Sequence, residues 1–268
     1  MSEPKAPEYA LQLSDVELER YRMMAEAARE AETELWQCAG IVPGATVADV
    51  GCGPGAMFPA IVNAVGAGGR VIGVDGVAGT VAQAQALVDA KGWPNVEVRS
   101  GKADATGLAP ESVDTVMMRH VLAHNGPTEQ AIVDHLATLV KPGGHAYLVD
   151  ISGAMFYMKP EDPDVDELNE AYRTFHAQQG NDLNTGTRLD DLLIAAGMEV
   201  VLYRGWFNIV KPKGQMRPPS WAARDAMIAA GVISAADLDR YEAGLERVLS
   251  QGSTIFAPLF GAVGRRPA

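Results

Sequence analysis

The stretch VADVGCGPGA at residues 47–56 decides the fold expected for this chain. Residues 47–50 have the apolar pattern of a buried strand, and the glycines Gly51, Gly53 and Gly55 follow at alternate positions. Glycine accepts a left-handed backbone and carries no side chain, so such a loop turns sharply into a helix and lets a ligand approach its backbone. The stretch predicts a strand, a glycine loop and a helix that bind a nucleotide-like ligand.

The alternation of strand and helix continues beyond this loop. Apolar runs typical of buried strands lie at 70–75, 95–101, 113–118 and 145–151, with helical segments between them at 77–91 and 127–140. Strands of this kind are typical of a parallel sheet covered by helices on both faces. With two late strands at 198–210 and 254–263, the pattern predicts an α/β fold with a doubly wound, seven-stranded, mostly parallel sheet.

The rest of the chain divides around this sheet domain. Residues 1–39 contain a polar tail and a helical pattern, and we expect them to cap the domain. The domain itself is expected at residues 40–210 and 254–268, with a helical insertion at residues 211–253. An insertion of that length predicts a lid over the site or a surface for a homodimer.

Composition disfavours several functions. The chain of 268 residues has 22 Lys and Arg against 34 Asp and Glu, and its net charge of −12 disfavours nucleic acid and anionic membrane surfaces as partners. Its two cysteines, Cys38 and Cys52, form neither a disulfide framework nor a zinc motif. With no apolar run of membrane length and no signal region, we expect a cytoplasmic protein without a bound metal.

Three acids mark the first three strands. Asp49 lies within the first strand, Asp75 ends the second and Asp104 follows the third. Asp75 has the spacing of a carboxylate that hydrogen-bonds ribose hydroxyls, and Asp104 is placed to accept from an adenine amino group. These positions predict a cofactor that contains adenosine.

A nicotinamide-dependent oxidoreductase is one alternative for such a cofactor. Gly51, Gly53 and Ala56 satisfy the dinucleotide pattern G-x-G-x-x-A, and Asp75 follows at a suitable distance. However, the carboxylate of Asp49 suits an ammonium or a loop amide better than a pyrophosphate. The two late strands also take the place of a second mononucleotide-binding half. Both features favour a different adenosine cofactor.

Five segments in order resemble the motifs of class I S-adenosylmethionine-dependent methyltransferases. They are VADVGCGPG (47–55), VIGVD (71–75), KADATGL (102–108), MMRHVLAH (117–124) and LVKPGGHAYLVD (139–150). The resemblance covers about residues 40–205, and AVGRRP at 262–267 is similar to the end of the last strand in many members. The most similar subgroups are the ubiquinone/menaquinone-type and small-molecule natural-product methyltransferases, which places the chain in secondary metabolism.

The resemblance implies S-adenosylmethionine as the cofactor and assigns residues to its parts. Asp49 and Gly51 would hold the methionine end. Asp75 would bind both ribose hydroxyls, and Gly76 would flank the adenine ring. The motif match is therefore specific for the cofactor, while it says little about the substrate.

Further contacts are implied around the same cofactor. Asp104 and Ala105 would meet the edge of the adenine. Arg119 and His120, after the fourth strand, would present their backbone to the sulfonium end. The loop residues expected beneath the ligand are Cys52, Gly53 and Gly55.

The transfer itself needs little chemistry from the protein, because the cofactor carries the activated methyl group. The protein orients the reactants and excludes water. An oxygen or nitrogen acceptor needs a group that takes its proton, and histidine suits that role near neutral pH. His120 and His124 are the candidate catalytic bases, and Tyr21 of the N-terminal helix is a candidate residue on the acceptor side.

The acceptor is expected to be a small organic molecule, methylated on O, N or C. Apolar and aromatic residues follow the fifth strand at 155–158 and lie near the insertion at Trp206, Phe207 and Trp221. If they form one wall, they suit an aromatic or polyketide-like acceptor. The remaining alternatives are a protein that binds S-adenosylmethionine as a cyclase, rearrangement enzyme or sensor, and the NAD-dependent oxidoreductase.

Overall fold

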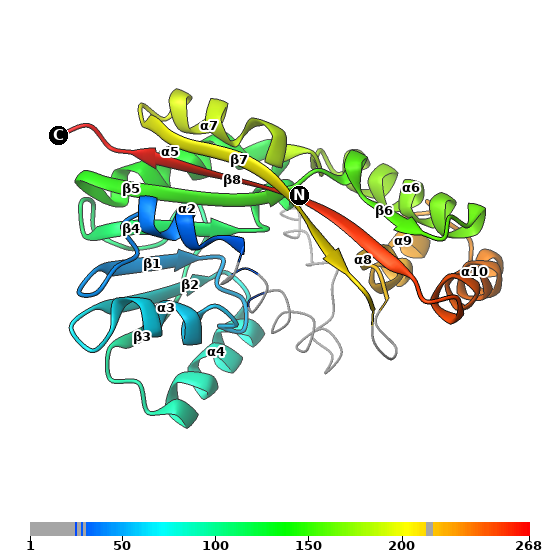
Figure 1. The fold of residues 1–268 in the computed structure, drawn as a ribbon, viewed down its shortest axis with the longest axis horizontal. Coiled ribbons are helices and arrows are strands. Elements are labelled where there is room, and N and C mark those ends of the chain that lie inside the picture. Colours follow the sequence, from blue (N-terminus) through cyan, green and yellow to red (C-terminus); the bar gives the residue numbers. More distant parts are fainter. Residues whose placement is uncertain (1–24, 26–27, 29–30, 213–216) are drawn as a thin grey trace, which may run out of the picture.

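The computed structural model describes residues 25, 28, 31–212 and 217–268. Their central feature is an eight-stranded sheet in the order β3-β2-β1-β4-β5-β8-β6, with β7 paired to β8 (Figure 1). The strands are β1 (Thr46–Val50), β2 (Arg70–Asp75), β3 (Val96–Ser100), β4 (Val113–Arg119), β5 (Val140–Ile151), β6 (Tyr157–Lys159), β7 (Glu199–Val210) and β8 (Thr254–Arg265). The α/β prediction with a mostly parallel, doubly wound sheet is confirmed.

The first five strands run parallel, with β1 between β2 and β4. Asp49 of β1 lies opposite Gly73 of β2 and Met117 of β4. Residues 47–50 are all buried, which is the pattern of a central parallel strand covered on both faces. The carboxyl ends of β1, β2 and β4 therefore meet at one edge of the sheet, where the expected site residues lie.

The sheet has one strand more than the seven expected. β8 runs antiparallel to β5, β6 and β7. Because Ile255 and Phe256 pair with both β6 and β7, β6 must occupy the same edge of β8 as β5, farther along the strand. β6 has only three residues, too few to show a hydrophobic period, and the sequence analysis missed it for that reason.

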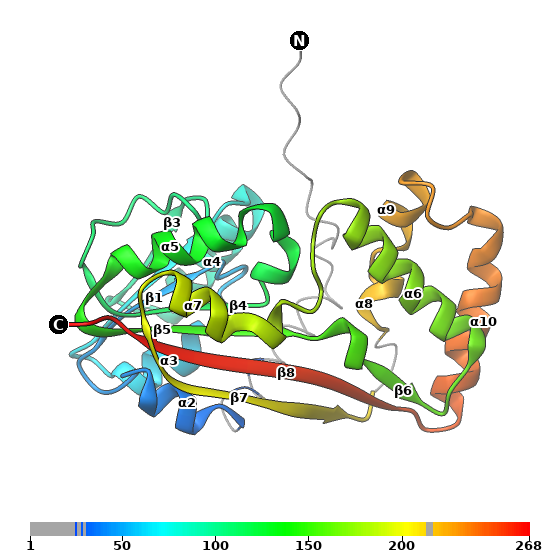
Figure 2. The ribbon, with the colours of Figure 1, turned by 90° about the horizontal axis from the view of Figure 1, so that it is seen from above.

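Helices cover both faces of the sheet (Figure 2). One face packs against α5 (Glu129–Leu139) and α7 (Leu189–Ala195). The other packs against α2 (Thr33–Cys38), α3 (Phe58–Val65) and α4 (Ala78–Lys91). The apolar residues of both faces are almost fully buried. This close packing holds the strands in place, and with them the residues at the strand ends that form the site.

A helical lobe extends beyond this sheet. It consists of α6 (Pro163–Gln178), α8 (Pro219–Ala222), α9 (Arg224–Ala229) and α10 (Leu238–Ser250). These helices share a third apolar core with β6 and the far end of β8, including Met158, Leu168 and Leu245. In the sequence, α6 precedes β7, and α8, α9 and α10 follow it. The lobe therefore includes one helix, α6, that lies outside the insertion expected at residues 211–253. Among the described residues, none of the helices combines the length and apolarity needed to cross a membrane.

Ion pairs hold α6 against α10. Asp162 caps α6 by accepting from the Asp164 N–H at 3.0 Å, and it also binds Arg247 at 2.8 Å. Arg240 binds Asp164 and Glu167, both at 2.7 Å. The acidic run at 161–167 therefore spans the start of a helix that faces two arginines.

Candidate cofactor site

The glycine loop has the backbone that its sequence predicts. Gly51, Gly53 and Gly55 have φ angles of 77°, 54° and 79°, values that favour glycine. A Cβ on Gly51 would lie 2.4 Å from Cγ2 of Val121, so this glycine lets the loop after β1 approach the loop after β4. A Cβ on Gly53 would meet no atom within 4 Å. The loop thus leaves an open backbone surface at Gly53.

Asp75 ties the end of β2 to this loop. Its Oδ2 accepts from the Gly53 N–H at 2.9 Å, and its Oδ1 accepts from the Val77 N–H at 2.9 Å and the Thr80 hydroxyl at 2.7 Å. Because a carboxylate oxygen has two lone pairs, Oδ2 retains capacity for one more donor. Thr80 was not expected from the sequence, since its role depends on the start of α4 folding back onto Asp75.

Asp49 is the most isolated acid of the site. Asp49 is 2 % exposed, and its Oδ2 has no hydrogen-bond partner among the described residues. Burial raises the pKa of Asp49 to about 7, Arg119 opposes that shift, and Asp75 adds to it. A buried carboxylate oxygen without a donor is suited to bind a cation or an N–H group of a ligand.

Cys52 is a packed loop residue. It is buried, and burial, with the nearby charges of Asp49 and Asp75, raises the pKa of its thiol far above the usual range. A thiol that stays protonated is a poor nucleophile. Cys52 therefore shapes the loop, and its expected contact with the cofactor stays a prediction.

Arg119 joins a buried polar cluster at the end of β4. Its Nη2 lies 2.5 Å from Oε1 of Glu32, and the hydroxyl of Tyr147 donates to Oε2 of the same carboxylate at 2.5 Å. Glu32 is fully buried, and only 8 % of the Arg119 side chain is exposed. Arg119 also donates to Sδ of Met57 at 3.4 Å. The cluster fastens the start of the α2 region to the sheet beside Asp49.

Sequence reasoning missed Glu32 and Tyr147. The resemblance implied a role only for the backbone of Arg119, whereas its side chain binds Glu32, 87 residues away in the sequence. One signal was present: Glu32 precedes Leu35 and Trp36 at the three- and four-residue spacings of one helix face, and both are buried. An acid on an apolar face indicates a buried partner.

The loop after β4 carries both candidate bases. His120 has a φ of 57°, a left-handed conformation that is uncommon for residues other than glycine, and its N–H donates to Val149 O at 2.9 Å. His124 lies in a short 3-10 helix, η1 (Leu122–His124). Oδ2 of Asp150 accepts from the Ala123 N–H at 3.0 Å and fixes this helix to β5. The loop after β4 therefore carries both histidines at the same edge of the sheet, with His120 directly after Arg119.

His124 also contacts the helical lobe. Its ring centroid lies 4.9 Å from that of His176 on α6, and His176 is 4 % exposed. Burial lowers the pKa of His176 to about 4, so this imidazole is neutral at physiological pH. The contact brings the loop after β4 and the lobe together.

Asp104 and Ala105 lie in an exposed loop after β3. An isolated bridge joins Lys102 to Ala105, and the Thr106 N–H donates to Nε2 of His135 at 3.1 Å. Asp75 pairs with Ser100 across the adjacent strands, so this loop starts at the edge that carries Asp75. Gly76 is exposed at the same edge, and Tyr21 lies outside the described residues.

The apolar residues expected to form one wall fall on different faces. Met158 is buried in the lobe core, whereas its neighbour Tyr157 is 40 % exposed. Trp206 packs on the α2 side of the sheet, and the adjacent Phe207 is 47 % exposed. Successive residues of a strand point to opposite faces, so residues 155–158 and 206–207 cannot all line one surface.

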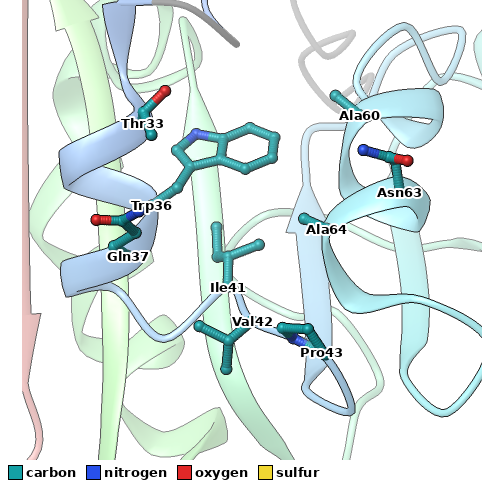
Figure 3. A pocket seen from close by; sticks show the side chains of 9 residues that line it. All are labelled: Thr33, Trp36, Gln37, Ile41, Val42, Pro43, Ala60, Asn63 and Ala64. Carbon is teal, nitrogen blue, oxygen red and sulfur yellow. The ribbon is translucent and has the colours of Figure 1, made fainter.

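A cavity of about 300 Å³ lies away from this edge, between α2 and α3 (Figure 3). Trp36 and Ile41 face Ala60 and Asn63 across it. None of the expected site residues lines it. Over residues 25, 28, 31–212 and 217–268, no group of three or more His, Cys, Asp or Glu side chains could hold a metal ion.

Comparison with known sequences gives a methyltransferase signature. Residues 47–144 match the model of a methyltransferase domain. The chain is 33% identical over 113 residues to an arsenite methyltransferase of Halobacterium salinarum, covering 42% of this chain and 29% of that protein. It is 33% identical over 116 residues to a ubiquinone biosynthesis O-methyltransferase of Paracidovorax citrulli, covering 42% and 47%. The matched segment thus spans less than half the length of these two relatives.

Solved structures show the same fold over most of the chain. The YcgJ protein from Bacillus subtilis has a TM-score of 0.58 at 18% identity and covers 89% of this chain and 99% of its own. The [4+2]-cyclase SpnF has a TM-score of 0.55 at 15% identity and covers 91% and 83%. At these identities the likeness concerns the fold alone.

Proposed function

Because the chain belongs to the class I S-adenosylmethionine-dependent methyltransferases, we propose that it transfers the methyl group of this cofactor to a small organic acceptor. S-adenosylhomocysteine would be the product. The observation that carries the proposal is the glycine loop held by Asp75 beside the unpaired carboxylate oxygen of Asp49. The conclusions on the site residues and the acceptor below are part of the same proposal.

The described residues fit S-adenosylmethionine. The bare backbone at Gly53 admits a ligand, and Oδ2 of Asp75 can accept from a ribose hydroxyl. Oδ2 of Asp49 can accept from the ammonium of the methionine part. The open loop and the two carboxylate oxygens thus match a neutral sugar and a cationic tail better than a pyrophosphate.

The cofactor, when bound, supplies the activated methyl group. Asp75, Asp49 and the loop orient it, while Asp104, Ala105 and Gly76 would flank the adenine. His120 or His124 would accept the proton of an oxygen or nitrogen acceptor. The loop after β4 carries both histidines, and His120 directly follows Arg119, so proton removal and cofactor binding would occur at one edge of the sheet.

The finer part of the proposal is an aromatic or polyketide-like acceptor. Phe156, Tyr172 and Trp221 pack against the lobe core and remain partly exposed. Partly exposed rings provide the apolar surface that binds a planar acceptor. The support comes from the lobe and not from the single wall that the sequence suggested.

Calorimetry on the full chain tests the cofactor first. We expect binding of S-adenosylmethionine and S-adenosylhomocysteine and no heat of binding with NAD. Binding of NAD in their place would contradict the proposal and favour an oxidoreductase.

Turnover tests the reaction. Phenols and quinols, compared with aliphatic amines and hydroxy acids, are incubated with S-adenosylmethionine, and S-adenosylhomocysteine is measured against a reaction without acceptor. We expect release with aromatic acceptors. Release only with the aliphatic compounds would overturn the acceptor class, and conversion of an acceptor with no S-adenosylhomocysteine formed would overturn methyl transfer.

A further inference from the structure

The cluster at the end of β4 contains an unbalanced set of buried charges. Glu32 and Asp49 are 0 % and 2 % exposed. The negative charges of both carboxylates stabilise the charged guanidinium of Arg119 and raise its pKa. Each oxygen of Glu32 has a partner, because one binds Arg119 and the other binds Tyr147. The oxygen left over is Oδ2 of Asp49, which has no partner in the described part of the chain.

Two neighbouring acids add further negative charge, because neutral N–H and O–H donors, and not cations, bind them. The charge of Arg119 also lowers the pKa of Asp150, whose oxygens accept from the N–H groups of Ala123 and Ile151. Asp75 accepts from the N–H groups of Gly53 and Val77 and from the hydroxyl of Thr80. Glu32 and Arg119 therefore neutralise each other, and Asp49 remains as a buried carboxylate with an oxygen that has no partner among the described residues.

The cluster lies where the reacting atoms must lie under the proposed function. Arg119 precedes the candidate base His120 directly, and Gly51 touches Val121 of the same loop. Charges that are buried act over longer distances than exposed charges, because less solvent screens them. Each charge of the cluster should thus be felt at the methyl-donating centre.

We propose that the Glu32–Arg119 pair is a positioning and specificity-determining device, in which Glu32 cancels the charge of Arg119 so that the negative charge of Asp49 acts unopposed and the site prefers a sulfonium to a neutral thioether. S-adenosylmethionine carries the sulfonium, and S-adenosylhomocysteine differs by losing it with the methyl group. The preference favours the substrate form of the cofactor and the departure of the product form. This inference rests on the proposed function.

Charge removal tests the device through the ratio of two dissociation constants. At pH 8, the affinities for S-adenosylmethionine and S-adenosylhomocysteine are measured by calorimetry for the wild-type chain and for Glu32→Gln. Removing the carboxylate leaves the Arg119 charge uncompensated, which repels the sulfonium. We expect the preference for S-adenosylmethionine to fall about tenfold.

A double variant separates charge from structure. In Glu32→Gln/Arg119→Met both charges of the pair are gone, so the balance at Asp49 is that of the wild type. We expect the ratio of the two affinities to return to its wild-type value, even if both affinities fall together because the packing has changed. A purely structural role would weaken both ligands in every variant and leave their ratio constant.

Glu34→Gln is the matched control. Glu34 lies on the same helix, but it is exposed and pairs with Arg204 at 2.6 Å. Its ratio should equal that of the wild type. An unchanged ratio in Glu32→Gln, or a double variant that keeps the ratio of Glu32→Gln, would overturn the inference. Failure of the wild-type chain to bind either ligand would instead defeat the proposed function.

Discussion

The ion pairs of the site and those of the helical lobe follow different designs. At the site, one guanidinium, Arg119, binds the buried carboxylate of Glu32, and 8 % of its side chain is exposed. In the lobe, Arg240 and Arg247 bind three acids of α6, and their side chains are 39 % and 48 % exposed. Buried pairs are sensitive to the loss of either partner, whereas exposed pairs are screened by water and salt. The difference indicates that the loss of one charge costs more stability at the site than in the lobe, where the pairs hold α6 against α10.

The largest effect should be the loss of turnover when a candidate base of the site, His120 or His124, is replaced. If one of them takes the proton of the acceptor, His120→Ala or His124→Ala should lower kcat about 10²- to 10⁴-fold. Steady-state rates with the best acceptor check this. His145→Ala, at the opposite edge of the sheet, is the control and should keep its rate. Undiminished turnover in both site variants would remove histidine catalysis.

Breaking the buried pair should reduce stability strongly. Arg119→Met leaves the Glu32 carboxylate buried without its cation, and we expect a loss of about 3–5 kcal/mol in the free energy of unfolding. Urea denaturation measures it. The double variant Glu32→Gln/Arg119→Met should recover most of the loss, and a double variant as unstable as the single one would show that packing, not charge, dominates.

Loss of the Asp75 carboxylate should weaken the cofactor. Asp75→Ala removes the acceptor proposed for the ribose and releases Gly53, so we expect the affinity for S-adenosylhomocysteine to fall about 100-fold. Calorimetry measures the affinity. Thr80→Val, which removes one donor from the same carboxylate, should have a much smaller effect. Unchanged binding by Asp75→Ala would exclude its role in the cofactor site.

Titration of Asp49 should make binding depend on pH. Its pKa in the folded protein is about 7, above the ordinary value of 3.8, so the free site holds a proton below pH 7. A ligand cation favours the ionised form, and affinity for S-adenosylhomocysteine, which keeps the ammonium, should rise as pH increases through 7 and then level off. Asp49→Asn should abolish this rise, and a wild-type affinity that is flat between pH 6 and 8 would contradict it.

The same titration acts on stability with the opposite sign. The folded state of the free protein binds the Asp49 proton more tightly than the unfolded state, so this contribution is complete below pH 3.8 and is lost as pH rises through 7. Asp49→Asn should flatten that part of the stability profile.

The smallest effect should come from the lobe. Arg240→Gln removes contacts to Asp164 and Glu167, but the pairs are exposed and Arg247 still binds Asp164. We expect the variant to have a melting temperature close to that of the wild type. In high salt the difference between the two melting temperatures should become smaller still, because salt screens exposed ion pairs. A loss as large as that of Arg119→Met would remove the distinction between the two regions.

The parts of the site that could be predicted are those encoded by short segments. The glycine loop and Asp75 belong to continuous motifs, and the rule that parallel strands meet at one edge places Asp49 near them. Glu32 and Tyr147 lie 115 residues apart, and only the docking of α2 brings them together. Their pairing depends on tertiary packing that a local pattern does not contain.

The lobe shows the same limit. The run at 161–167 has the composition of a solvated loop, and it is helical because Asp162 caps it and the arginines of α10 neutralise it. Those arginines follow more than seventy residues later. The sequence could therefore predict a helical insertion at residues 211–253, but not the helix α6 on which α10 of that insertion packs.

The strand β8 limits how this protein could be re-engineered. It contributes Ile255 to the lobe core and Val263 to the sheet core, while β7 pairs with it from one end to the other. An exchange of residues 211–253 alone would leave α6 and β6 with a foreign partner. A transplant that alters acceptor choice would have to move those elements together and join them within the shared β7–β8 ribbon, so the lobe is not a detachable cassette.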